Sequence, residues 1–215
     1  MANLYFRDYI RISPFKKSKP TFAECINCFT AFLKQFPFFT EDDLNGLGKY
    51  FDYFSAKKNE TILLPGEVCE YIIFTCKGAV KQVAKNENGL HIIELLPAGN
   101  FCTAINSFKT KRNTVVGFVC AQQTYGIKLS LENYEKLIKQ RPNFEKLLNS
   151  TYEHGINHLI YRLTTFQSLD ANGRYSNLLR EQPDVFEKFT MNDIASYLGI
   201  KPETLSRLRK KIGAK

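Results

Sequence analysis

A glycine near the C-terminus constrains the fold of this 215-residue chain more than any other residue. Gly199 follows a stretch of helical periodicity that opens at Thr190, whose hydroxyl can cap a helix. Glycine supplies the left-handed backbone that a tight turn between two helices needs. Pro202 then suits the first turn of a second helix. The segment therefore predicts two helices joined by a short turn.

The apolar residues around this turn have the spacing of a helix-turn-helix. Ala195 is small where a second helix must cross closely, and Ile200 can fill the corner between the helices. Leu205, six positions after Gly199, falls on the inner face of the second helix. We therefore expect these four residues to build a helix-turn-helix.

Basic residues gather in the same segment. The chain has a formal net charge of +9, and the stretch from Lys188 to Lys215 holds seven basic residues and only two acidic ones. Such a cluster is the electrostatic footprint of a polyanionic partner such as DNA. The outer face of the second helix can accept from cytosine, donate to guanine or neutralise phosphates; it comprises Glu203, Thr204, Ser206, Arg207, Lys210 and Lys211.

Residues 60 to 130 instead show a period of two, typical of strands. Short β-branched and aromatic runs alternate with glycine- and proline-containing turns. We expect an antiparallel barrel or roll with strands at 61–64, 71–76, 79–83, 91–95, 114–120 and 124–129. Helical periodicity precedes it over residues 21 to 54 and returns after Ser130.

A long amphipathic helix is predicted over residues 143 to 168. Its apolar residues recur at intervals of three and four, and the stripe includes Leu159 and Leu163. This stripe must pack on the roll, on a second copy of itself, or on both. Turn-forming residues at 169–173 then predict a hinge.

Composition favours a cytoplasmic globular protein. Hydrophobic residues make up 44% of the chain, but no window approaches the length of an apolar membrane span. Arg7, Asp8 and Arg11 interrupt any signal-peptide core, so we expect six reduced cysteines and no disulfide framework. No nucleophile elbow, phosphate loop or close acidic pair predicts an enzyme, and we expect no catalytic residues.

The C-terminal motif resembles that of the Crp/Fnr regulators, in the form common in Bacteroidetes. The resemblance rests on the stretches 195–200 and 202–207, with support upstream from 65–67, 77–78, 97–101 and 174–175, and covers roughly residues 22 to 212. It implies a cyclic-nucleotide-binding-like β-roll, a long dimerisation helix and a C-terminal winged helix. It also places Glu203, Ser206 and Arg207 at the base-reading positions; we assign phosphate contacts to Lys201, Thr204, Arg209, Lys210 and Lys211.

The effector pocket departs from the cyclic-AMP-binding members of that family. Where they carry a Gly-Glu pair, this chain reads Thr103-Ala104, so the carboxylate that holds the ribose is absent. Arg112-Asn113 only approximates the phosphate-binding pair, in an offset position. We therefore expect no cyclic AMP and no cofactor. The pocket candidates for an unidentified effector are Gly99, Phe101, Thr103, Ala104, Arg112 and Asn113.

Two metal or redox alternatives arise from the sequence. Cys25 and Cys28 have the spacing of two cluster ligands, although the next cysteine is Cys69, and buried apolar thiols explain them more simply. His154 and His158 lie one helical turn apart, a zinc-compatible spacing that polar positions on a dimer helix also explain. We expect no metal site.

The sequence as a whole predicts an α+β chain in four parts. These are a basic arm (1–20), a β-roll sensor with flanking helices (21–142), the dimerisation helix (143–168) and the helix-turn-helix domain (169–215). We expect a homodimeric transcription regulator that binds a palindromic operator in double-stranded DNA under control of a small-molecule effector. RNA polymerase is a further expected partner, and a membrane is not. The alternative is a ligand or redox sensor whose DNA contact is vestigial.

Overall fold

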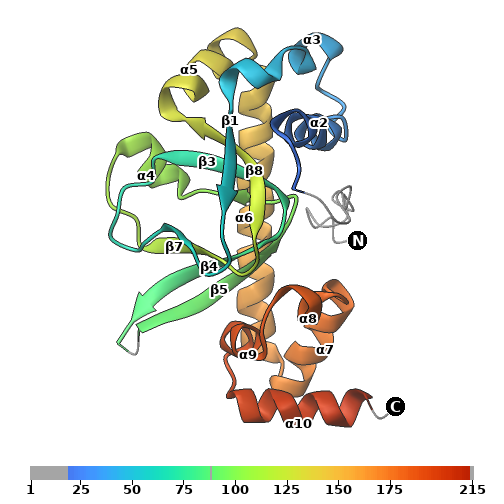
Figure 1. Ribbon diagram of the computed structural model, residues 1–215. Helices are drawn as coiled ribbons and strands as arrows, with labels where there is room; N and C mark the ends of the chain where they lie inside the picture. The colour runs from blue at the N-terminus through green and yellow to red at the C-terminus, as the bar shows by residue number, and fades with distance from the viewer. Residues whose placement is uncertain (1–18, 88, 214–215) are drawn as a thin grey trace.

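The computed structural model describes residues 19–87 and 89–213, so most of the basic N-terminal arm lies outside the described residues. The N-terminal part is a roll of two antiparallel four-stranded sheets, with the orders β1-β8-β3-β6 and β2-β7-β4-β5 (Figure 1). The strands are β1 (Asp52–Ala56), β2 (Thr61–Leu63), β3 (Tyr71–Lys77), β4 (Ala79–Asn86), β5 (Gly89–Pro97), β6 (Phe101–Cys102), β7 (Val116–Cys120) and β8 (Thr124–Ser130).

Helices pack on the β1-β8-β3-β6 sheet. The helix α2 (Phe22–Leu33) begins at a capping box between Thr21 and Glu24 and lays its aromatic stripe on β3. The ring centroids of Phe29 and Phe32 lie 4.9 and 5.0 Å from that of Phe74. The other helices of this part are α3 (Glu41–Leu44), the 3₁₀ turn η1 (Leu47–Tyr50), α4 (Ile105–Thr110) and α5 (Leu131–Gln140).

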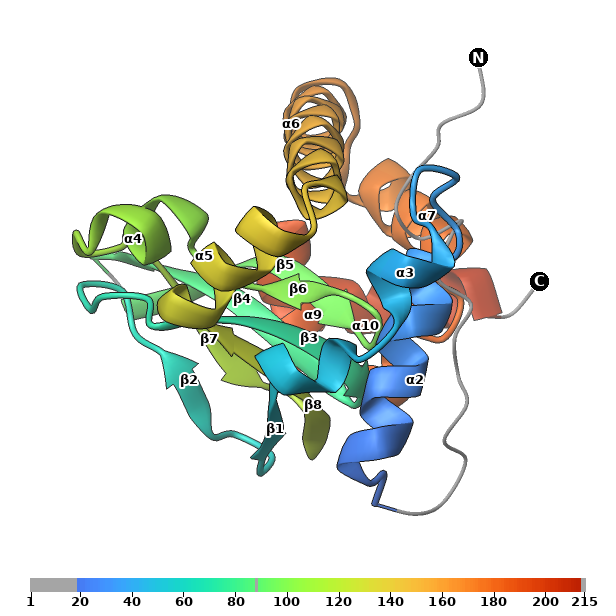
Figure 2. The same cartoon turned by 90° about the horizontal axis from the view of Figure 1, so that it is seen from above.

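The long helix α6 (Asn143–Ser168) runs past the roll to the C-terminal domain (Figure 1). Figure 2 views it nearly along its axis, at one side of the roll. Phe144 and Leu147 in its first turns are buried, whereas Leu159 and Leu163 are 68% and 60% exposed. Among residues 19–87 and 89–213, no helix is both long and apolar enough to cross a membrane.

The C-terminal domain consists of helices and short connections in its described part. It comprises α7 (Ala171–Glu181), α8 (Val185–Lys188), α9 (Met191–Leu198) and α10 (Pro202–Gly213). The expected wing is not formed by the described residues, because no strand occurs between residues 131 and 213. The segment between α7 and α9 forms the single helical turn α8 instead, since Val185 and Phe189 are both drawn into the core.

The C-terminal domain and the roll share one apolar core. Val83 and Ile92 of the β4–β5 hairpin belong to the same buried cluster as Ile194 of α9. At its edge, the backbone N–H of Ile92 donates to the hydroxyl of Ser196 over 3.0 Å. The helix α9 is therefore packed directly against the strand β5 of the roll.

Candidate nucleic-acid interface

The turn between α9 and α10 is fixed by hydrogen bonds at both ends of α9. At its start, Thr190 and Asp193 form a capping box, with N–H to side-chain oxygen distances of 3.1 and 3.2 Å. At its end, Gly199 adopts a φ of +65°, and the N–H of Ile200 donates to the carbonyl of Ala195 over 3.0 Å. The left-handed residue therefore reverses the chain without leaving the last carbonyls of α9 unpaired.

The helix α10 lies at the end of the molecule, with α9 between it and the roll (Figure 1). Leu205 is completely buried, so the opposite face of α10 must point to solvent. Of the expected base readers, Glu203 and Arg207 are exposed and Ser206 is half-buried. The Arg207 guanidinium lies 3.5 Å from the Thr204 hydroxyl, one helical turn away. The three base-reading candidates therefore share an accessible face.

The expected phosphate ligands divide into two groups. Lys201, Lys210 and Lys211 are exposed. Arg209 is exposed as well, but its guanidinium lies 4.5 Å from the ring centroid of Phe186 in α8. This cation–π contact holds Arg209 against its own domain. The lysines are therefore better placed than Arg209 to approach a phosphate backbone.

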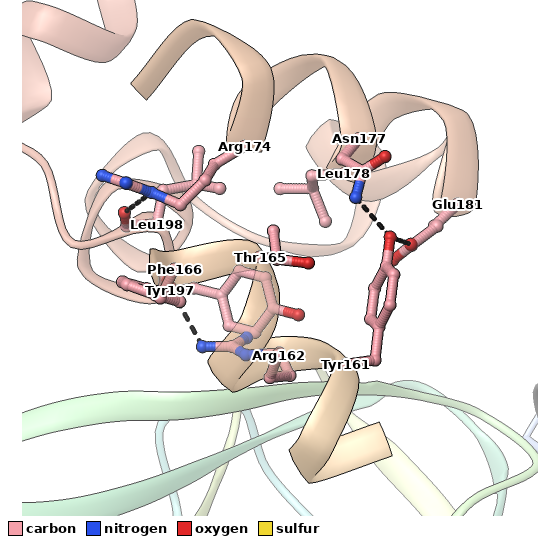
Figure 3. A pocket seen from close by; sticks show the side chains of 10 residues that line it. All are labelled: Tyr161, Arg162, Thr165, Phe166, Arg174, Asn177, Leu178, Glu181, Tyr197 and Leu198. Carbon is pink, nitrogen blue, oxygen red and sulfur yellow. Dashed lines mark hydrogen bonds between the residues drawn. The ribbon is translucent and has the colours of Figure 1, made fainter. Parts of the chain in front are cut away.

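Two arginines that sequence reasoning did not assign to the site connect α9 with α6 and α7 (Figure 3). Arg174 of α7 donates from Nε to the carbonyl of Leu198 over 3.1 Å, and Arg162 of α6 donates from Nη2 to that of Tyr197 over 3.4 Å. Cations at a helix C-terminus interact favourably with its dipole. The guanidinium carbons lie 4.9 and 5.2 Å from the ring centroid of Phe166. No sequence signal marks these pairings, because they join segments far apart in the chain.

The effector-pocket candidates do not converge on one cavity. Phe101 and Thr103 line an apolar cavity of about 70 Å³ between the sheet and α2, α5 and α6. Ala104 precedes α4, and its N–H donates to Cys69 Sγ over 3.4 Å. Arg112 is exposed. The remaining two, Gly99 in a left-handed turn and Asn113 in a bridge with Val68, do not line this cavity.

A larger cavity of about 410 Å³ lies between β2, β3, β6 and the loop before β3. Glu67 and Glu70 line it, together with mostly apolar side chains, and none of its lining residues among those described is basic. Two carboxylates repel the phosphate of a cyclic nucleotide. The lining of this cavity therefore disfavours that ligand.

The residues behind the metal and redox alternatives have protein partners. Cys25 and Cys28 are buried beside Cys76 of β3; hydrogen bonding with Cys25 and Cys28, together with burial, raises the pKa of Cys76 far above its usual range. His158 Nε2 lies 2.5 Å from a carboxylate oxygen of Glu94, which joins α6 to β5. Within the part of the chain described, no group of three or more His, Cys, Asp or Glu side chains could hold a metal ion.

The β-roll, long helix and helix-turn-helix together define a fold shared with cyclic-nucleotide-binding-like transcription regulators. FixK2 of Bradyrhizobium japonicum superposes with a TM-score of 0.67 at 18% identity, covering 76% of this chain and 85% of that one. The c-di-GMP responsive global regulator CLP of Xanthomonas campestris gives 0.63 at 14% identity, covering 81% and 92%.

In sequence, the chain is similar to the cAMP-activated global transcriptional regulator CRP of Salmonella typhimurium. The two are 23% identical over 161 residues, which cover 70% of this chain and 77% of that protein. No family model matches the sequence. The weak sequence similarity and the shared fold support a regulator of the Crp/Fnr type.

Proposed function

We propose that this chain is a DNA-binding transcription regulator that acts as a homodimer on a palindromic operator. The observation that carries the proposal is the α9–Gly199–α10 unit, whose buried face is anchored by Leu205 while Glu203, Arg207 and the lysines remain accessible. An exposed helix with acidic, hydroxyl and guanidinium groups in its first turns and lysines in its last turns suits insertion into a major groove.

The exposed stripe of α6 supports the dimer. Tyr152, Ile156, Leu159, Leu163 and Phe166 alternate at intervals of four and three, and each is at least 40% exposed. Alternating intervals of this kind keep one seam of a helix facing a partner helix. A second copy of α6 covers the stripe by two-fold symmetry, and the same symmetry presents two α10 helices to the two halves of a palindrome.

We propose control by a small molecule other than cyclic AMP, because Ala104 offers no carboxylate to a ribose hydroxyl. The acidic lining of the larger cavity, at Glu67 and Glu70, supports the same conclusion.

Selection of bound DNA from a random pool, with the intact protein, tests the function. We expect a palindromic motif. Arg207→Ala should cost about 1–3 kcal/mol of binding free energy and relax preference at one base pair of each half-site. Lys210→Ala should weaken all sequences about equally and reduce the salt slope. An unchanged motif after Arg207→Ala would exclude α10 as the base reader.

A further inference from the structure

A small pocket of about 30 Å³ lies where α6, α7 and α9 meet (Figure 3). Two helix faces form most of its wall, and the C-terminal end of α9 closes it. The lining residues are Tyr161, Arg162, Thr165 and Phe166 of α6, Arg174, Asn177, Leu178 and Glu181 of α7, and Tyr197 and Leu198 of α9. The pocket therefore touches the proposed dimer helix and the first helix of the helix-turn-helix at once.

Two hydrogen-bond donors in this wall are unused. Arg162 Nη1 is buried and makes no hydrogen bond to any of the described residues. The Arg162 guanidinium stacks 3.7 Å from the ring centroid of Tyr197, which stabilises its charge but leaves this N–H without an acceptor. The hydroxyl of Thr165, in the middle of the group in Figure 3, also has no hydrogen-bond partner in the described part of the chain, but Thr165 is only half-buried and its hydroxyl is accessible to solvent. A buried donor such as Arg162 Nη1 normally finds an acceptor.

The charged groups of the pocket favour an anion. Arg162 and Arg174 contribute two guanidinium groups, whereas Glu181 contributes the single carboxylate of the lining. That carboxylate already accepts a hydrogen bond from the Tyr161 hydroxyl. An acceptor that brings one negative charge balances the charge of the pocket and satisfies the unused donors.

We propose that this pocket binds a small oxyanion, the carboxylate or phosphate group of an effector, held by Arg162 Nη1 and the Thr165 hydroxyl. A space of about 30 Å³ admits only a head group of a few atoms, so the rest of the effector projects into solvent. The inference rests on the proposed function, because it makes this pocket a control point for the DNA-binding domain.

The contacts of Phe166 give such an anion a route to the helix-turn-helix. Its ring lies against both guanidinium groups, and a Cβ placed on Gly199 would be 3.0 Å from its Cε1 atom. An anion that draws Arg162 toward Thr165 changes the contact between the Arg162 guanidinium and the Phe166 ring. The orientation of α9 and α10 relative to α6 then depends on occupancy of the pocket.

Thermal unfolding of the full chain tests the proposal, with sodium phosphate and sodium acetate as probes and sodium chloride at matched ionic strength as reference. We expect a saturable rise in melting temperature with at least one probe. The more effective of the two identifies the head group. Thr165→Val removes one hydroxyl at nearly constant volume and should weaken the apparent affinity about tenfold. Arg162→Lys, which keeps the charge but loses Nη1, should do the same.

Thr164→Val is the matched control, because the Thr164 hydroxyl bonds to its own helix at the Ile160 carbonyl and does not line the pocket. It should leave the anion response unchanged. The proposed anion site would be contradicted if Thr165→Val and Thr164→Val gave equal anion responses. It would also be contradicted if neither probe gave a saturable rise in melting temperature beyond that in chloride. Failure to select DNA while the anion response persists would instead overturn the proposed function, so the two failures are distinguishable.

Discussion

Replacing Gly199 by alanine probes the turn of the helix-turn-helix and its contact with α6 together. The residue has a φ of +65° and a ψ of 37°, where a side chain costs about 1–2 kcal/mol. The new Cβ would also lie 3.0 Å from Cε1 of Phe166, so that ring must shift by a few tenths of an ångström. Moving the side chain off its preferred rotamer to make this room costs about 0.5–1.5 kcal/mol. We therefore expect Gly199→Ala to lower the free energy of unfolding by about 1.5–3.5 kcal/mol, measured by urea denaturation.

Gly46→Ala separates the two contributions. Gly46 has nearly the same backbone conformation, with a φ of +67°, but a Cβ there meets no atom within 4 Å. Gly46→Ala should lower the free energy of unfolding only by the cost of the left-handed backbone. The additional loss of free energy in Gly199→Ala should disappear when Phe166 is also replaced by alanine. Equal losses at the two glycines in the otherwise unmodified protein would refute the contact between Phe166 and the turn.

Three further predictions address the dimer, the effector and the domain contact. Replacing Leu159 and Leu163 by glutamate should give monomers in sedimentation, and a stable monomer of the unmodified protein at micromolar concentration would contradict the dimer. Calorimetry should detect no tight cyclic AMP binding, because Ala104 leaves the ribose hydroxyl unpaired at a cost of about 1–3 kcal/mol; a low-micromolar dissociation constant would reverse this view. Lys81 Nζ lies 2.9 Å from Asp193 Oδ1 in a largely buried pair, so Lys81→Met should lower the free energy of unfolding by about 1–3 kcal/mol, and no loss would show that the pair does not hold α9 on the roll.

Local signals in the sequence predicted much of the fold. The period of three and four over residues 143–168 gave the bounds of α6, and the turn formers between 65 and 100 separated most of the strands. The expected β-roll with a C-terminal helix-turn-helix is confirmed by the shared fold. These features are predictable because periodicity, caps and turns each depend on residues close together in the chain.

Two strands, β1 and β6, were not predicted, because each depends on a pairing partner that is distant in the chain. β1 was assigned to the helical stretch at 21–54, because it buries only Ala56 fully and shows no alternation. It is a strand because it pairs with β8, whose residues lie 68 to 76 positions later in the chain. β6 has two residues, too few for any pattern, and is defined by its pairing with Ile73 and Phe74. Partners distant in sequence create these strands, so the local sequence does not show them.

The candidate site also contains some features that the local sequence predicts and others that it does not. The positions of Gly199 and Leu205 follow from local sterics, but the support given to α9 by Arg162 and Arg174 depends on which helices meet. The local sequence does not show that either arginine contacts α9, although Arg174 belongs to one of the stretches that support the family resemblance. The unused donor at Arg162 is visible only once the three helices are placed together.

The apolar core common to the hairpin β4–β5 and the helix α9 limits how this protein can be rebuilt. A hybrid made by joining residues 169–213 to a foreign sensor would expose Ile194 on one side, and the donor roll would expose Val83 and Ile92 on the other. The hybrid and the remaining roll would each expose an apolar surface, which favours aggregation. The DNA-binding helices of this chain therefore cannot be transferred alone to another protein. The β4–β5 hairpin must be transferred together with them.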